Sequence, residues 1–164
     1  MAKIVTGIFK NRRAADDAVG HLYEAGFSER EISVLMSDAT RGREYGFEES
    51  SKAPEGAVAG ATAGGALGAI AAGLIAVGVV AVPGLGLVAA GPLLAVLAGA
   101  GAGGAAGGLI GGLVGAGIPE HEATVLASDV AEGGILVGVY AHDDNARQAE
   151  SILKSAGAMS VARG

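Results

Sequence analysis

The feature that most constrains this sequence is a stretch of 64 consecutive residues, 56–119, without any Asp, Glu, Lys, Arg or His. Glycine and alanine dominate the stretch, and Leu, Ile and Val recur through it. Its one sharp break is Val82-Pro83-Gly84-Leu85-Gly86. No solvent-exposed loop has this composition, so we expect the stretch to be packed against other apolar surface.

The break divides the stretch into two apolar arms. The arms are residues 57–82 and 92–118, with a short turn or collar at 85–91 between them. Pro92 suits the first turn of a helix and no deeper position. Each arm exceeds the roughly 20 residues that cross a bilayer as a helix. The sequence therefore predicts an α-helical hairpin within residues 56–118.

Glycine recurs at every fourth position in both arms. Residues four apart share one face of a helix, so each arm would carry a groove in which another backbone packs closely. Glycine is about 1 kcal/mol less favourable than alanine in a helix, and neither arm would persist alone in water. We expect helix-packing and oligomerisation contacts at Gly56, Gly60, Gly64, Gly68, Gly103, Gly107, Gly111 and Gly115, beside a parallel run at Gly104, Gly108 and Gly112.

Either lipid or protein could shield the apolar arms of this hairpin from water. The nine Leu, Ile and Val residues of the first arm favour insertion by roughly 4 kcal/mol in total, at about 0.3–0.6 kcal/mol each. Residues 98–108 contain only alanine and glycine, which suits a seam between helices better than a lipid face. A membrane-inserted hairpin is our leading interpretation. The alternative is a hairpin buried in a soluble oligomer, whose core could hold a hydrophobic small molecule such as a lipid or quinone.

The charge balance excludes several partners. The 164 residues carry a net charge of −6 with a pI near 5.0, which argues against nucleic acid and against electrostatic docking on anionic lipid. There is no cysteine, which excludes disulfides and thiolate metal sites and fits a cytoplasmic compartment. The first residues show no signal-peptide pattern, so we expect none.

The segments on either side of the charge-free stretch share one strand–helix–strand pattern. The first half predicts a strand at 4–9, a helix at 12–25 and a strand at 32–36; the second predicts a strand at 135–140, a helix at 144–156 and a strand at 158–161. A shift of 131 residues aligns Gly7 with Gly138, Ala15 with Ala146, Leu22 with Leu153 and Gly26 with Gly157. Two such βαβ units about a pseudo-twofold axis predict a ferredoxin-like sheet.

The predicted fold class is therefore α+β, a ferredoxin-like βαβ–βαβ domain with a glycine-zipper hairpin inserted between its halves. One further helix, opened by Pro119, precedes the third strand and buries Ala123, Leu126, Ala127 and Val130. Residues 37–55 are polar without periodicity and indicate a mobile linker. The expected divisions are the first half at 1–38, the polar linker at 39–55, the hairpin at 56–118 and the second half at 119–164.

Several of these residues resemble a known family. The opening half carries Gly7-Ile8-Phe9, Ala15, Ala18, Val19, Leu22, Gly26-Phe27 and Glu31-Ile32-Ser33-Val34, and it resembles the general stress protein 17M-like (heat-induced stress protein) domain. The closing half carries Gly117-Ile118-Pro119-Glu120, Gly133-Gly134-Ile135-Leu136-Val137 and Gly157-Ala158, and it resembles bacterial proteins that join such a domain to a glycine-rich hydrophobic hairpin. The resemblance implies a bacterial, stress-associated protein linked to the membrane, and it supplies no catalytic residues.

No arrangement of polar residues predicts an active site. Glu120-His121-Glu122 point in different directions on a helix, whereas a metal needs a convergent set. His21 and His142 are expected to be structural or solvated, and Asp143 or Asp144 to cap a helix. The neighbours Asp16-Asp17 and Glu48-Glu49 do not form facing carboxylates. We therefore expect no enzyme, catalytic residue, metal or cofactor.

The leading functional hypothesis is a non-enzymatic, stress-associated membrane protein that self-associates through its glycine zipper. Its α+β domain would lie in the cytoplasm and its hairpin in the bacterial inner membrane. The alternative is a cytoplasmic, soluble oligomeric scaffold with the hairpins in its core. Both hypotheses make a second copy of the chain the principal partner.

Overall fold

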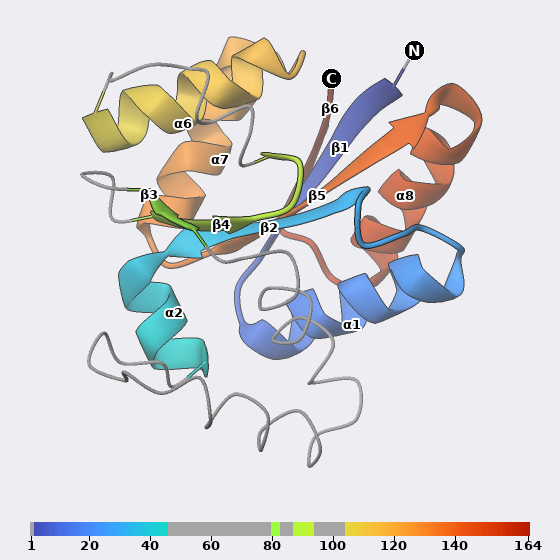
Figure 1. Cartoon of the computed structure of the whole chain (residues 1–164), viewed down its shortest axis with the longest axis horizontal. Helices are drawn as coiled ribbons and strands as arrows, with labels where there is room; N and C mark the ends of the chain where they lie inside the picture. Colours follow the sequence, from blue (N-terminus) through green and yellow to red (C-terminus); the bar gives the residue numbers. More distant parts are fainter. Residues whose placement is uncertain (1, 46–79, 83–86, 94–103) are drawn as a thin grey trace.

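The computed structural model describes residues 2–45, 80–82, 87–93 and 104–164. In this part of the chain the fold is mixed α+β, an antiparallel sheet with helices on both faces (Figure 1). The elements are β1 (Ala2–Phe9), α1 (Arg12–Glu24), β2 (Ile32–Ser37), α2 (Asp38–Tyr45), β3 (Val80–Val82), β4 (Leu87–Ala90), α6 (Gly104–Gly115), α7 (Glu120–Ala131), β5 (Ile135–His142), α8 (Asp143–Ser155) and β6 (Ser160–Arg163).

The two ends of the chain share one sheet of order β3-β4-β2-β5-β1-β6. Its centre is the ladder between β1 and β5, which pairs Ala2 with His142 and Phe9 with Ile135. β6 continues the sheet beside β1, and β2 continues it beside β5. The strands predicted before and after the charge-free stretch therefore interleave, and neither half could bury its own apolar faces alone.

The predicted repeat is visible in the two strand–helix units. α1 and α8 are each 13 residues long, and a shift of 131 carries one onto the other. Each is followed by a glycine of positive φ, Gly26 at 94° and Gly157 at 92°. The chain then turns back, with Phe27 N bonded to Leu22 O at 3.0 Å and Ala158 N to Leu153 O at 3.1 Å. Glycine adopts this left-handed conformation without steric cost.

One hydrophobic core lies between the sheet and helices α1 and α8. Successive side chains of a strand point to opposite faces, and the residues of β1 that face this core include Val5 and Phe9, both fully buried. The helices contribute stripes three and four residues apart. The largest members of this core are Phe9, Leu22, Phe27, Ile32, Met36, Ile135 and Leu153.

A second core lies on the opposite face, beneath α6 and α7 (Figure 1). β1 supplies Ile4 and Ile8, the residues that alternate with those of the first core. The predicted stripe of α7 is confirmed, because Ala123, Leu126, Ala127 and Val130 are all buried. α6 adds Leu109 and Leu113, at 2% and 0% exposure. The sheet is thus covered on both faces, and residues 4–9 of β1 and 135–139 of β5 are buried.

The prediction of a mobile linker was wrong for its first part. Residues 38–45 lie within the polar segment 37–55 and include the first seven residues of the expected linker 39–55, and they form helix α2. Ser37 caps this helix, since its Oγ accepts a hydrogen bond from Thr40 N at 3.1 Å. Thr40 is fully buried. Sequence periodicity missed the helix because only one of its described side chains is buried.

The expected hairpin arms also differ from the described elements. Val80–Val82 and Leu87–Ala90, placed in the first arm and the collar, form strands β3 and β4, which pair with each other. β4 also pairs with β2, from Val34↔Ala90 to Ser37↔Leu87. The second arm, predicted at 92–118, contains α6, which packs on the sheet. Among the described residues, no helix has both the length and the apolarity needed to cross a membrane.

Candidate functional site

Helix α6 is the described part of the predicted glycine zipper. Its sequence, GAAGGLIGGLVG, has six glycines and no polar side chain. It ends where Gly117 adopts φ 98°, and Ile118 N returns to Leu113 O at 3.1 Å. Pro119 then occupies the N-cap position of α7. This tight connection holds α6 against α7, and both against the sheet.

The two glycine runs of α6 have different surroundings. Gly108 and Gly112 are buried, next in sequence to the core residues Leu109 and Leu113. Gly107, Gly111 and Gly115 are exposed. Val114, beside them on the helix, is 41% exposed. Few large apolar side chains in the described part of the chain are this exposed. We call Gly107, Gly111, Val114 and Gly115 the glycine face.

At two positions of this face, Gly107 and Gly115, a larger side chain would meet no neighbouring element. A Cβ added at either position would have no atom within 4 Å apart from the adjacent residues and the backbone of α6 itself. Each of these glycines nevertheless makes the helix about 1 kcal/mol less stable than alanine would. A helix that is apolar all round is normally enclosed. The glycine face is therefore an apolar surface with room for a close neighbour.

The structure describes only part of the predicted contact set. Gly107, Gly111 and Gly115 lie together on the exposed side of α6. Gly103 and the whole first-arm set, Gly56, Gly60, Gly64 and Gly68, lie outside the described residues.

The histidine candidates are not brought together. His21, His121 and His142 are all exposed. His121 Nε2 lies 3.8 Å from Glu122 Oε1, and no group of three or more metal-binding side chains occurs in the described ranges. The expected cap at Asp143 or Asp144 was wrong, because His142 holds that position and both acids lie in the first turn of α8. Asp143 bonds Lys3 instead, at 3.0 Å, and this contact lowers its pKa.

One buried charge was missed from the sequence. Asp16, on α1, is 1% exposed, and its Oδ2 accepts a hydrogen bond from Arg12 Nε at 3.2 Å. Its Oδ1 has no hydrogen-bond partner among the described residues. Loss of hydration raises the pKa of Asp16 to about 6, although the hydrogen bond and charge of Arg12 oppose the shift. The spacing of Arg12 and Asp16 suggests an ion pair, but the burial of Asp16 depends on the tertiary structure.

Searches against protein families, curated proteins and solved structures found no match to this chain. The resemblance to the general stress protein 17M-like domain therefore stays a prediction from the motif residues.

Proposed function

We propose that this protein is a non-enzymatic scaffold that self-associates, and that the glycine face of α6 is one of its contact surfaces. The observation that carries this proposal is an entirely apolar helix with one side packed on the sheet and the other side open. Two glycines on the open side have free space where a Cβ would lie. A second glycine-rich helix could approach to backbone contact there. The stress-associated role remains the one that the family resemblance implies.

The packing of α6 favours protein as the covering surface. Leu109 and Leu113 hold α6 on the sheet, so the second arm cannot leave the domain as one helix of residues 92–118. Residues 94–103, between the described parts of that arm, would span about 15 Å as a helix, half of the roughly 30 Å hydrocarbon core of a bilayer. The soluble oligomer, the alternative in the sequence analysis, is therefore the better supported form.

The membrane-linked form remains the second candidate. Its support is the first arm, because residues 56–79 contain no charged side chain and are long enough to cross a bilayer once. In this form α6 would not be part of the spanning segment. The α+β domain would lie in the cytoplasm, beside the bacterial inner membrane.

We also propose that the core sheet is ferredoxin-like. Strands β2, β5, β1 and β6 lie in this spatial order, and α1 and α8 contribute to the same core. Two βαβ units that interleave about their first strands give this arrangement. Strands β3 and β4 would then be an extension beside β2 that the ferredoxin-like pattern does not include.

Sedimentation velocity of the purified full chain without detergent tests self-association. We expect the wild type to form a species larger than a monomer. Gly107→Leu should raise the dissociation constant of this species about 10- to 100-fold. The Leu side chain would hold the two backbones apart, and we take the energetic cost to be comparable to that of overpacking a protein core. Gly20→Leu is the matched control, since Gly20 lies on α1 with nothing within 4 Å of its Cβ position.

A monomeric wild type would refute the proposed self-association. An oligomer that Gly107→Leu and Gly115→Leu both leave unchanged would exclude the glycine face as the contact. Fractionation of cells with and without detergent separates the two forms, since only the membrane-linked form requires detergent for extraction.

A further inference from the structure

Helix α2 is attached to the domain in two different ways along its length. Its first half is fixed by buried contacts at the end of β2. Thr40 is fully buried, its hydroxyl lies 2.8 Å from Ser37 Oγ, and its backbone N–H donates to the same oxygen at 3.1 Å. This end of α2 belongs to the folded core.

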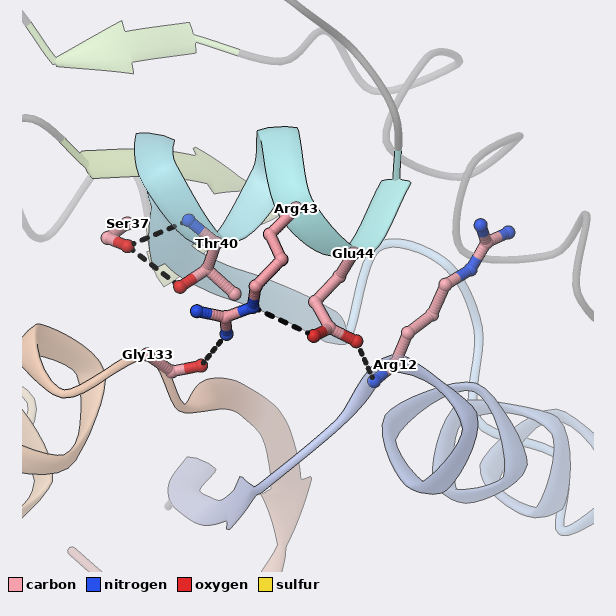
Figure 2. A network of polar contacts seen from close by, with 6 residues as sticks. All are labelled: Arg12, Ser37, Thr40, Arg43, Glu44 and Gly133. Atoms are coloured by element: carbon pink, nitrogen blue, oxygen red, sulfur yellow. Dashed lines mark hydrogen bonds and ion pairs between the residues drawn. The ribbon is translucent and has the colours of Figure 1, made fainter.

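The second half of α2 is held by polar contacts to two other elements (Figure 2). Arg43 Nη2 donates to Gly133 O, in the turn between α7 and β5, at 3.3 Å. Glu44 Oε2 accepts from Arg12 N, at the start of α1, at 3.1 Å. Arg43 Nε and Glu44 Oε1 are themselves 3.1 Å apart. The Arg43–Glu44 pair therefore joins α2 to both halves of the chain at once.

No buried apolar contact reinforces this end among its described side chains. Arg43 is exposed, and Arg41, Gly42 and Glu44 are only partly buried. Gly42 weakens an already short helix, and a helix of eight residues is marginal without tertiary contacts. The contact between Glu44 and Arg12 N is favourable because a carboxylate at a helix N-terminus satisfies a free N–H and complements the helix dipole. The attachment of this end of α2 to the domain thus depends on a few hydrogen bonds made by charged side chains.

We propose that α2 is a strap whose second half opens locally, about its fixed first half, and that the Arg43–Glu44 pair is its fastening. Opening would expose the first N–H of α1 to water and release Gly133 O. It would also move the point where the chain leaves the domain from Tyr45 back to Thr40. The five residues 41–45 could then add a reach of about 17 Å when extended. The strap would control how many residues after β2 stay attached to the domain.

Hydrogen exchange of the full chain, read by mass spectrometry on peptides from α2, tests this mechanism. We expect Glu44→Ala and Arg43→Met each to speed exchange of the amides of residues 42–45 about tenfold, the effect of losing one charged hydrogen bond. Exchange in β1 and β5 should not change. Wild-type protein in 1 M NaCl should show a change in the same direction, because the Debye length falls to about 3 Å.

The matched control is Glu150→Ala on α8. It also removes a carboxylate that pairs with a basic side chain, since Glu150 contacts Lys154 four residues away, but it joins no strap residue. It should leave exchange in α2 unchanged. The proposal is overturned if Glu44→Ala and Arg43→Met leave α2 exchange unchanged. It is also overturned if α2 opens only together with β1 and β5, or if wild-type residues 42–45 exchange without any protection.

Discussion

Replacing Asp16 by Asn should reduce the pH dependence of stability. Burial raises the pKa of Asp16 from 3.8 to about 6, and one unit corresponds to about 1.4 kcal/mol. The raised pKa means that the folded state binds this proton more tightly than the unfolded state does. The contribution to the free energy of unfolding is therefore fully present below pH 3.8 and lost as the pH rises through about 6. The expected loss is up to about 3 kcal/mol.

Urea unfolding of the wild type and Asp16→Asn between pH 4 and pH 7.5 measures this effect. Asn retains an oxygen that can accept the hydrogen bond from Arg12 Nε, so the variant chiefly removes the buried charge. We expect the free energy of unfolding of Asp16→Asn to rise relative to the wild type as the pH increases, by up to about 3 kcal/mol. Asp17→Asn is the control, because Asp17 is the exposed neighbour. A difference between Asp16→Asn and wild type that is equal at both ends of this range would refute the reasoning.

Two further substitutions test the packing. Gly91→Ala should destabilise the fold by about 3 kcal/mol in urea unfolding, because Gly91 has φ 86° and a Cβ there would lie 2.3 Å from Ile32 O. Gly26→Ala is its control: Gly26 has a similar φ of 94°, but a Cβ there would meet no neighbouring element within 4 Å, so the cost should be only about 1–2 kcal/mol. Tyr140→Phe should leave the melting temperature unchanged or raise it, because the buried Tyr140 hydroxyl has no hydrogen-bond partner in the part of the chain that the structure describes. A clear decrease would mean that the hydroxyl forms a stabilising contact.

The strand–helix units were predictable because their signals are local. The stripe of Ala15, Ala18 and Leu22 on α1 is buried as expected, and its counterpart on α8 contains Ala146, Ala149 and Leu153. Gly26 and Gly157 end the two helices in the way that such glycines commonly do. After these glycines the copies diverge, because β2 begins at Ile32 and β6 begins sooner, at Ser160. The repeat therefore predicted helices more accurately than the final strand.

Elements that depend on distant contacts were not predictable in this way. α2 is stabilised by Arg12 and Gly133, which are 32 and 90 residues from their partners. Strand β4 lies inside the apolar stretch, where a short hydrophobic run fits a strand and a buried helix equally well. Its assignment follows from its pairing with β2. The burial of Asp16 likewise depends on what packs around α1, and no local pattern contains that information.

The two glycine runs of α6 differ in burial, and the sequence did not predict this difference. Their spacing is identical, so periodicity alone does not distinguish the surroundings of one run from those of the other. Leu109 and Leu113 break this equivalence, because they turn the side with Gly108 and Gly112 toward the sheet. Part of the apolar surface that covers the charge-free stretch is thus the protein's own sheet.

The size of the remaining surface constrains the proposed assembly. A helix of 12 residues is about 18 Å long, and a strip about 10 Å wide along it offers on the order of 200 Å² per copy. Stable protein interfaces bury about 1,200–2,000 Å² in total. The glycine face alone would therefore give a weak, concentration-dependent contact. A stable oligomer would need further surface, and the charge-free sequence outside the described residues, with Gly56, Gly60, Gly64 and Gly68, is the part of the chain whose composition suits that role.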